Sequence, residues 1–384
     1  MAIATFTPQQ RLRSLAAVIG TAFGVGAAIA AVVPLLANAL QRDGYSATAI
    51  GVNAMMFPVA VIAIGPFVPR IIARFGPLRS IYGGLGIAAA AVLLFPAMPD
   101  IYAWCVIRFV VGMAAAVHWV ASETWMNLIA EDSNRSRIMG VYAAVMSLGF
   151  VCGPLIINAT GIDGWLPFVA VSIAILVALV PMPLAGNVAP AMPSHKPRGL
   201  LHIVAGAPLV MGAALVSGFV DTGLFNQIAV YEAREGFSME TANLSLSVFM
   251  AGNFALQMPL GWLADRTGRR GLLLASSAII AIGAVIYPFV LHAGPILWVL
   301  MFLWGGVGFG IYTLGLALMG ERFSPANLAA ANAAFIMMYE VGSMTGPVVV
   351  GGAIDLWARY GLPAVIAVAS ALFVVFGLWT GRDR

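Results

Sequence analysis

Four ionisable side chains lie inside long apolar stretches of the sequence: Arg108, Glu123, Asp221 and Glu340. If such a stretch crosses a bilayer, a charge at its centre costs at least ~2.5–3.5 kcal/mol on insertion scales, so the residue is expected to serve a function or to be neutralised. A low dielectric disfavours the carboxylate anion, which lets a deep acid load a proton from one side and release it to the other. Glu340, Asp221 and Glu123 are therefore candidate proton-coupling residues.

The composition defines the class of protein. Of 384 residues, 61% are hydrophobic and only 9% are charged, against about 25% charged in an average soluble protein. This excludes a soluble domain and a disordered chain, and it predicts a multispanning protein whose first partner is the lipid bilayer. The arginines are scattered at segment ends, so no nucleic-acid partner is expected. No P-loop, metal motif or nucleophile constellation is visible, so neither an enzyme nor a cofactor is predicted.

Charged residues and Pro/Gly positions divide the sequence into twelve apolar segments. They fall at about 14–40, 46–72, 79–98, 101–130, 137–160, 165–184, 206–231, 240–264, 271–292, 295–320, 327–353 and 361–380. Their length and lack of alternation favour helices over barrel strands. Most of the 19 basic residues fall on the side that holds the N-terminus. The positive-inside rule therefore predicts cytoplasmic N- and C-termini in the cell (inner) membrane.

An internal repeat predicts two pseudo-symmetric six-helix bundles. The motif Gly261–Arg270 has a degraded counterpart at Pro69–Gly76, 192 positions earlier, and the Gly-x-x-x-Gly-Pro stretches at Gly149–Pro154 and Gly342–Pro347 differ by 193. The Pro-rich stretch Asn187–Gly199 lies between them. We expect an N-terminal bundle at 1–186, a cytoplasmic linker at 187–205 and a C-terminal bundle at 206–384.

These motifs resemble those of the major facilitator superfamily (MFS) over essentially the whole chain. The loop signature G-x-L-A-D-R-x-G-R-R is complete at Gly261–Arg270, while its first copy keeps only Arg74 and Gly76. The Gly-Pro motif looks like one associated with antiporters, although Asn158 replaces a Gly usual at its end. The stretch Ser122–Asn127 is similar to the YcaD-like branch of putative bacterial transporters.

The loop motif is expected to form a cytoplasmic gate. Asp265 can hold a neighbouring helix N-terminus, since the helix dipole favours negative charge there by about 0.3–1 kcal/mol. Arg266, Arg269 and Arg270 can pair with Glu321. The alternative is that these charges only set the topology. The full predicted gate set is Gly261, Asp265, Arg266, Gly268, Arg270, Glu321, Arg74 and Gly76.

The resemblance implies that spans one, four, seven and ten line a central cavity. Helical projection places Arg108, Gly112, Ala115, Trp119 and Glu123 on one face of span four. The predicted cavity residues are Arg108, Trp119, His118, Asn253, Gln257, Trp304 and Tyr312. The aromatics can instead be packing residues, Glu123 a partner for loop arginines, and His118 a helix contact rather than a proton relay.

These features predict a secondary active transporter with a small-molecule substrate, protons as the coupling ion and a monomeric state. Aromatic and carboxylate side chains favour export of an amphipathic or cationic molecule, with uptake of a small solute as the alternative. A non-transporting scaffold or sensor is the alternative from another class. Arg108 and Asp221, both in the outer halves of their spans, are predicted to form a latch, unless each has a partner within its own half.

Overall fold

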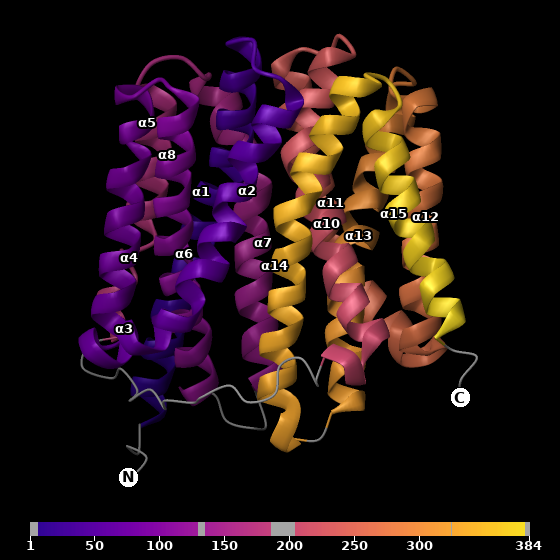
Figure 1. Cartoon of the computed structure of the whole chain (residues 1–384). Helices are drawn as coiled ribbons and strands as arrows, with labels where there is room; N and C mark the ends of the chain where they lie inside the picture. The colour runs from indigo at the N-terminus through magenta and orange to yellow at the C-terminus, as the bar shows by residue number, and fades with distance from the viewer. Residues whose placement is uncertain (1–6, 130–134, 186–203, 324, 381–384) are drawn as a thin grey trace. The chain divides into compact units, whose positions relative to one another are not determined.

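The computed structural model describes residues 7–129, 135–185, 204–323 and 325–380, and within these ranges it is helical without a strand (Figure 1). The first helices are α1 (Pro8–Arg42), α2 (Ala47–Ile64), η1 (Gly65–Phe67), α3 (Val68–Phe75), α4 (Pro77–Val92), α5 (Leu94–Ala97), α6 (Ile101–Ile129), α7 (Arg135–Thr160), α8 (Leu166–Val177) and η2 (Met182–Ala185). The later ones are α10 (Pro208–Arg234), α11 (Met239–Thr267), α12 (Arg269–Val290), α13 (Pro295–Arg322), α14 (Pro325–Leu356) and α15 (Gly361–Trp379). The all-helical prediction is therefore confirmed.

Eleven helices in the described ranges are long and apolar enough to cross a membrane. The segment predicted at 240–264 folds as α11, a 29-residue helix that is not among them. Asn253 and Gln257 lie in its middle, and polar amides lower the mean hydropathy of the helix. Twelve spans therefore remain a proposal, while the other eleven helices have the length and composition that spans of a multi-pass membrane protein need.

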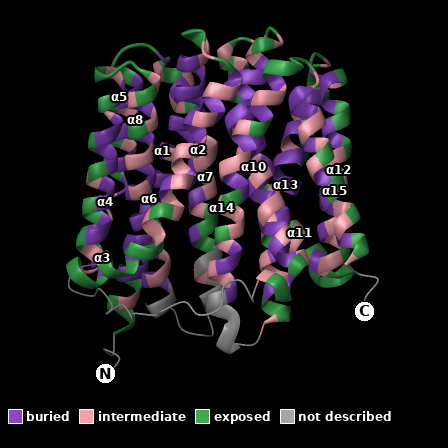
Figure 2. Ribbon diagram, in the orientation of Figure 1, coloured by how far each residue is buried: buried purple, intermediate pink, exposed green. Residues whose placement is uncertain are grey.

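Several helices in each unit expose apolar side chains of the kind expected for contact with lipid. Ile87 on α4, Leu176 on α8, Ile282 on α12 and Leu372 on α15 are each about half exposed or more (Figure 2). Exposing this much apolar surface to water would be unfavourable. Exposing it to lipid carries no such cost, because lipid tails are as apolar as these side chains. Some polar side chains, such as His118, Asp221 and Asn243, are instead buried.

The helices divide into two units by their contacts. Unit 1 comprises Met1–Leu35 and Val59–His195, and unit 2 comprises Leu36–Pro58 and Lys196–Arg384. In unit 1, α4 packs against α6 and α8; in unit 2, α10 packs against α14, α11 against α13, and α12 against α15. The segment Leu36–Pro58, which comprises the end of α1 and the start of α2, belongs by its contacts to the unit that contains the later helices. The expected boundaries at 186 and 206 stay a proposal.

The repeated Gly-Pro motif brings helix backbones together in both units. A Cβ on Gly149 would lie 2.3 Å from the carbonyl oxygen of Phe23, and one on Gly342 would lie 2.0 Å from that of Leu215. In unit 2 the close approach is reciprocal, since a Cβ on Gly218 of α10 would lie 2.0 Å from the carbonyl oxygen of Tyr339 on α14. Close packing through small residues is how membrane helices associate. The motif therefore has a structural role on α1–α7 and again on α10–α14.

The loop motif also repeats its backbone conformation. Gly76 ends α3 and begins α4 with φ +78°, and Gly268 joins α11 to α12 with φ +92°. The Gly76 N–H donates to the Ile72 carbonyl and the Gly268 N–H to the Ala264 carbonyl. Such positive φ values favour glycine because a Cβ is disfavoured there. The two predicted glycines are therefore required by the turn itself.

Candidate functional site

Two acidic residues of unit 2 lie near one tyrosine. Asp221 on α10 and Glu340 on α14 both interact electrostatically with Tyr339. The Tyr339 ring packs edge-on against Tyr312, with centroids 5.1 Å apart, and Tyr312 packs in the same way against Phe335. Two carboxyl groups and an aromatic cluster thus come together on α10, α13 and α14.

Asp221 is almost completely buried, with 1% exposure. Both of its carboxyl oxygens lack a hydrogen-bond partner among the described residues. A Cβ on Gly308 of α13 would lie 3.6 Å from Oδ1, so this glycine faces the carboxyl group directly. A buried carboxylate anion without a partner is strongly unfavourable, so the neutral acid fits this environment.

Glu340 is partly buried and forms no hydrogen bond or ion pair with any described residue. It differs from Asp221 in that part of its surface is accessible.

The predicted pairing of Asp221 with Arg108, which lies in unit 1 and is 5% exposed, stays a prediction.

The predicted stripe on α6 contains a short polar contact. The indole N–H of Trp119 donates to Oε1 of Glu123 at 2.6 Å. Trp119 is 36% exposed, so the pair is not sealed in the core. A carboxylate and an aromatic ring therefore present one joint surface on this helix.

His118 lies on the buried side of the same helix. Its Nε2 is 3.0 Å from Oγ1 of Thr21 on α1 and 3.2 Å from Oγ of Ser122. The ring is 1% exposed, which leaves no room for a solute. In this structure His118 is a helix contact, the alternative that the sequence left open.

Trp304, predicted as a cavity residue, is instead in the core of unit 2. It is 1% exposed, donates to the Ile280 carbonyl at 3.2 Å and packs against Tyr287. Its size and its single N–H suit a buried site with one acceptor. The structure therefore places the Trp304 side chain in the packing between α12 and α13, and its role in a cavity stays a prediction.

Asn253 and Gln257 form a polar chain with a residue that the sequence did not single out. The Gln257 amide donates to Oδ1 of Asn253 at 2.8 Å, and Oγ1 of Thr313 donates to Oε1 of Gln257 at 2.7 Å. Thr313 is exposed whereas Asn253 is 6% exposed. The chain leads from the buried face of α11 to an accessible hydroxyl on α13.

In the loop motif, one arginine makes the interactions expected of three. Arg269 binds Glu321 at 2.7 Å and Asp265 at 3.1 Å. Arg266 stacks on the Trp262 ring, 3.7 Å from its centroid, and Arg270 donates to the Gly377 carbonyl. Asp265 therefore binds Arg269, whereas we expected it to hold a neighbouring helix N-terminus.

The first copy of the loop has no such ion pair among the described residues. Arg74 lies over the Phe75 ring at 5.5 Å. Ala73 occupies the place of the acid in this copy, so a carboxylate is lacking. Gly261, in the complete copy, has open space around it.

Two further acidic residues with defined partners, Glu232 and Asp355, lie just beyond the ends of the apolar segments predicted from the sequence. Glu232 is fully buried and accepts a hydrogen bond from the Tyr287 hydroxyl at 2.8 Å. Asp355, near the end of α14, accepts from Thr48 and Arg234. Sequence reasoning missed both because each follows an apolar run directly and resembles an ordinary loop charge.

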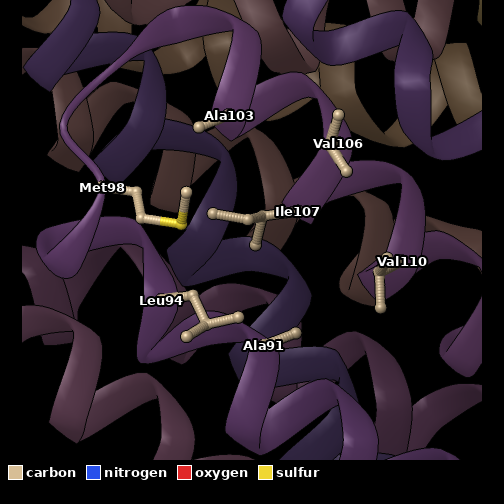
Figure 3. A pocket seen from close by; sticks show the side chains of 7 residues that line it. All are labelled: Ala91, Leu94, Met98, Ala103, Val106, Ile107 and Val110. Carbon is tan, nitrogen blue, oxygen red and sulfur yellow. The ribbon is translucent and has the colours of Figure 1, made fainter.

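One pocket of about 290 Å³ lies in unit 1 at α4, α5 and α6, and its lining is apolar (Figure 3). The lining residues are Ala91, Leu94, Met98, Ala103, Val106, Ile107 and Val110. None of the predicted site residues lies among them, so this pocket is separate from the acids and aromatics above.

Comparison with known protein families agrees with these features. A family model described as Major Facilitator Superfamily matches residues 15–313 and 210–384. The chain belongs to the Major Facilitator Superfamily. Among curated relatives, the uncharacterized MFS-type transporter YfkF of Bacillus subtilis (strain 168) is 26% identical over 333 residues, covering 83% of each chain. The uncharacterized MFS-type transporter YcaD of Escherichia coli O139:H28 (strain E24377A / ETEC) is 26% identical over 323 residues, again covering 83% of each.

Solved transporter structures share the fold. A mutant of the nucleoside transporter NupG has a TM-score of 0.78 at 13% identity, with 96% of this chain and 99% of that chain covered. An inward-facing bacterial homolog of the human lysosomal transporter Spinster has a TM-score of 0.74 at 17% identity, with 97% and 96% covered. The resemblance to the YcaD-like branch is confirmed, and MFS membership indicates transport of a small solute across a membrane rather than an enzyme activity.

Proposed function

We propose that this MFS protein is a proton-coupled secondary transporter that exports a small amphipathic or cationic organic molecule. The observation that carries the proposal is that Asp221, which is buried with both carboxyl oxygens unsatisfied among the described residues, and Glu340 both lie near Tyr339. Neither acid has a cation or hydrogen-bond donor among the described residues. An acid in such a place can bind a proton and give it up when a solute or the other conformation alters its surroundings.

The aromatic cluster supports the proposed substrate class. Tyr312, Phe335 and Tyr339 offer ring faces and edges beside the two acids. An organic cation gains from ring faces and from a carboxylate at once. Uptake of a small solute uses the same residues in the opposite direction and is the alternative within this class.

The proposed setting is the bacterial inner membrane, with twelve spans in two six-helix bundles at 1–186 and 206–384, cytoplasmic termini and a monomeric protein. The basic residues of the sequence support the orientation. The helical α11 supports the twelfth span. Protons and the small solute are the proposed partners, with no role for nucleic acid.

The test uses purified protein in proteoliposomes that contain a pH-sensitive dye. A panel of amphipathic cations and neutral solutes is added, and proton flux is recorded. We expect flux with at least one solute, loss of uphill accumulation in Glu340→Gln and Asp221→Asn, and retained solute exchange in both variants. Glu240→Gln, at an exposed acid, is the control. Wild-type uphill transport in both variants contradicts the assignment of the coupling sites, and absence of any solute movement in the wild type favours a scaffold or sensor.

A further inference from the structure

Helix α3, the last eight residues of the apolar segment Ala47–Phe75, is anchored in unit 1 by one face. Val68 and Ile72 are buried and lie four residues apart, and the helix contacts α4 and α6. The helical repeat places Arg70 and Arg74 on the opposite face. Both arginines are exposed (Figure 2). Helix α3 is therefore amphipathic, and its charged face is turned away from the unit.

Two exposed phenylalanines lie beside these arginines. The guanidinium carbon of Arg70 lies 5.8 Å from the centroid of the Phe67 ring, and that of Arg74 lies 5.5 Å from the centroid of the Phe75 ring. The two phenylalanines are 53% and 52% exposed. Arginines together with exposed aromatic rings are typical of a helix that lies in the headgroup region of a bilayer, where the rings reach the acyl boundary and the cations meet phosphate.

The two copies of the loop motif differ in their acids. In the second copy Arg269 pairs with Asp265 and Glu321. In the first copy Ala73 takes the place of that aspartate. Pro77 takes the place of the arginine that pairs with it. The sequence has no acidic residue at any position from 44 to 99, so the first copy cannot form these ion pairs from its own residues.

A third exposed cation, Arg79, lies in the first turn of α4. We call Arg70, Arg74 and Arg79 the first-loop arginines. Within the part of the chain that the structure describes, none of their guanidinium groups makes a hydrogen bond or an ion pair. A cluster of positive charge at the end of a membrane span attracts anionic lipid headgroups. The cluster is therefore open to an anion from outside the described chain.

We propose that the first-loop arginines bind the headgroup of an anionic phospholipid, with Phe67 and Phe75 in contact with the start of its acyl chains. The lipid phosphate supplies the counter-charge that two carboxylates supply in the second copy of the loop. Guanidinium groups suit this role because they can donate two parallel hydrogen bonds to one phosphate. The site depends neither on the direction of transport nor on the coupling ion.

The site is tested with the purified full chain in a neutral detergent, by native mass spectrometry. Phosphatidylglycerol and phosphatidylcholine with the same acyl chains are added, and we expect the wild type to bind phosphatidylglycerol preferentially. Arg70→Gln with Arg74→Gln is expected to weaken this binding about fivefold for each arginine removed. Ala73→Asp keeps every arginine but places a carboxylate three residues from Arg70, where the two can pair. We expect this variant to bind phosphatidylglycerol more weakly as well.

Arg266→Gln is the matched control, since Arg266 has the motif position of Arg74 and also stacks on an exposed ring, that of Trp262. It is expected to keep the wild-type preference, because its loop contains acids. Equal losses in Arg74→Gln and Arg266→Gln would show a general attraction between arginines and anionic lipid and would overturn the site. Wild-type affinity in both first-loop variants, or equal binding of the two lipids by the wild type, would overturn it too. Displacement of the lipid by millimolar inorganic phosphate would indicate a site for a free anion instead.

Discussion

Trp119 and Glu123 form one hydrogen-bonded unit on α6, with the indole N–H 2.6 Å from the carboxylate oxygen. They lie one helical turn apart, the spacing at which side chains on a helix face each other. The sequence placed both on one stripe, but it did not indicate that they bind each other. Glu123 is therefore oriented by an aromatic neighbour on its own helix.

This pairing predicts strong coupling between two variants. Trp119→Phe keeps a ring but removes the donor, and Glu123→Gln removes the charge. We expect each single variant to lower solute-driven proton flux and the double variant to lose little more. The interaction energy of this double-mutant cycle is expected to be about 0.5–3 kcal/mol. It is measured from the flux of the wild type, the two single variants and the double variant. Trp165→Phe, at an exposed ring, is expected to combine additively with Glu123→Gln, and additivity in both cycles would show that the contact has no role in transport.

Arg269 is predicted to be the arginine of the loop motif that matters most for switching. It alone joins Asp265 and Glu321 among the described residues, so Arg269→Ala breaks two ion pairs, whereas Arg266→Ala breaks a stacking contact with Trp262. Both acids are more than half exposed, at 66% and 55%, so each pair is worth only about 0–1 kcal/mol. We expect turnover to fall several-fold in Arg269→Ala and Asp265→Asn, with solute affinity within a few-fold of wild type. A large loss of affinity, measured by ligand-induced thermal shift, would contradict a role confined to switching.

The repeated glycines are predicted to be intolerant of a single methyl group. A Cβ at position 342 would overlap the Leu215 carbonyl oxygen, and one at 149 would overlap that of Phe23. We expect Gly342→Ala and Gly149→Ala to destabilise the protein by about 1–3 kcal/mol, the range for overpacked sites. Thermal unfolding followed by tryptophan fluorescence measures this. Gly86→Ala, where the added Cβ meets open space, is expected to leave the midpoint unchanged, and equal midpoints in all three variants would contradict the packing role.

The fold class and the repeat could be predicted because both depend on patterns that are visible along the chain. Apolar length marks a span, and the glycines of the repeat mark backbone contacts. Tertiary partners are not visible in this way. Trp304 and Tyr312 look alike on one predicted span, but only Trp304 is enclosed by α12, and nothing local distinguishes them.

Asp355 illustrates a second limit. Its partners Ala47 and Thr48 are backbone donors, and nearly every residue has a backbone N–H, so no residue type in the sequence points to this contact. Glu232 was missed for a related reason, since its partner Tyr287 belongs to another helix. Buried acids inside apolar runs could be found from sequence, and acids at the ends of the runs could not.

The polarity of α11 has a consequence for the order in which unit 2 is completed. Gln257 satisfies its amide oxygen with the hydroxyl of Thr313, and Gly252 fits against the Phe302 backbone, both on α13. A ribosome makes α11 and α12 before either of these partners exists. In the nascent chain α11 therefore lacks these partners until a later helix is made, and its final arrangement is a late event in synthesis.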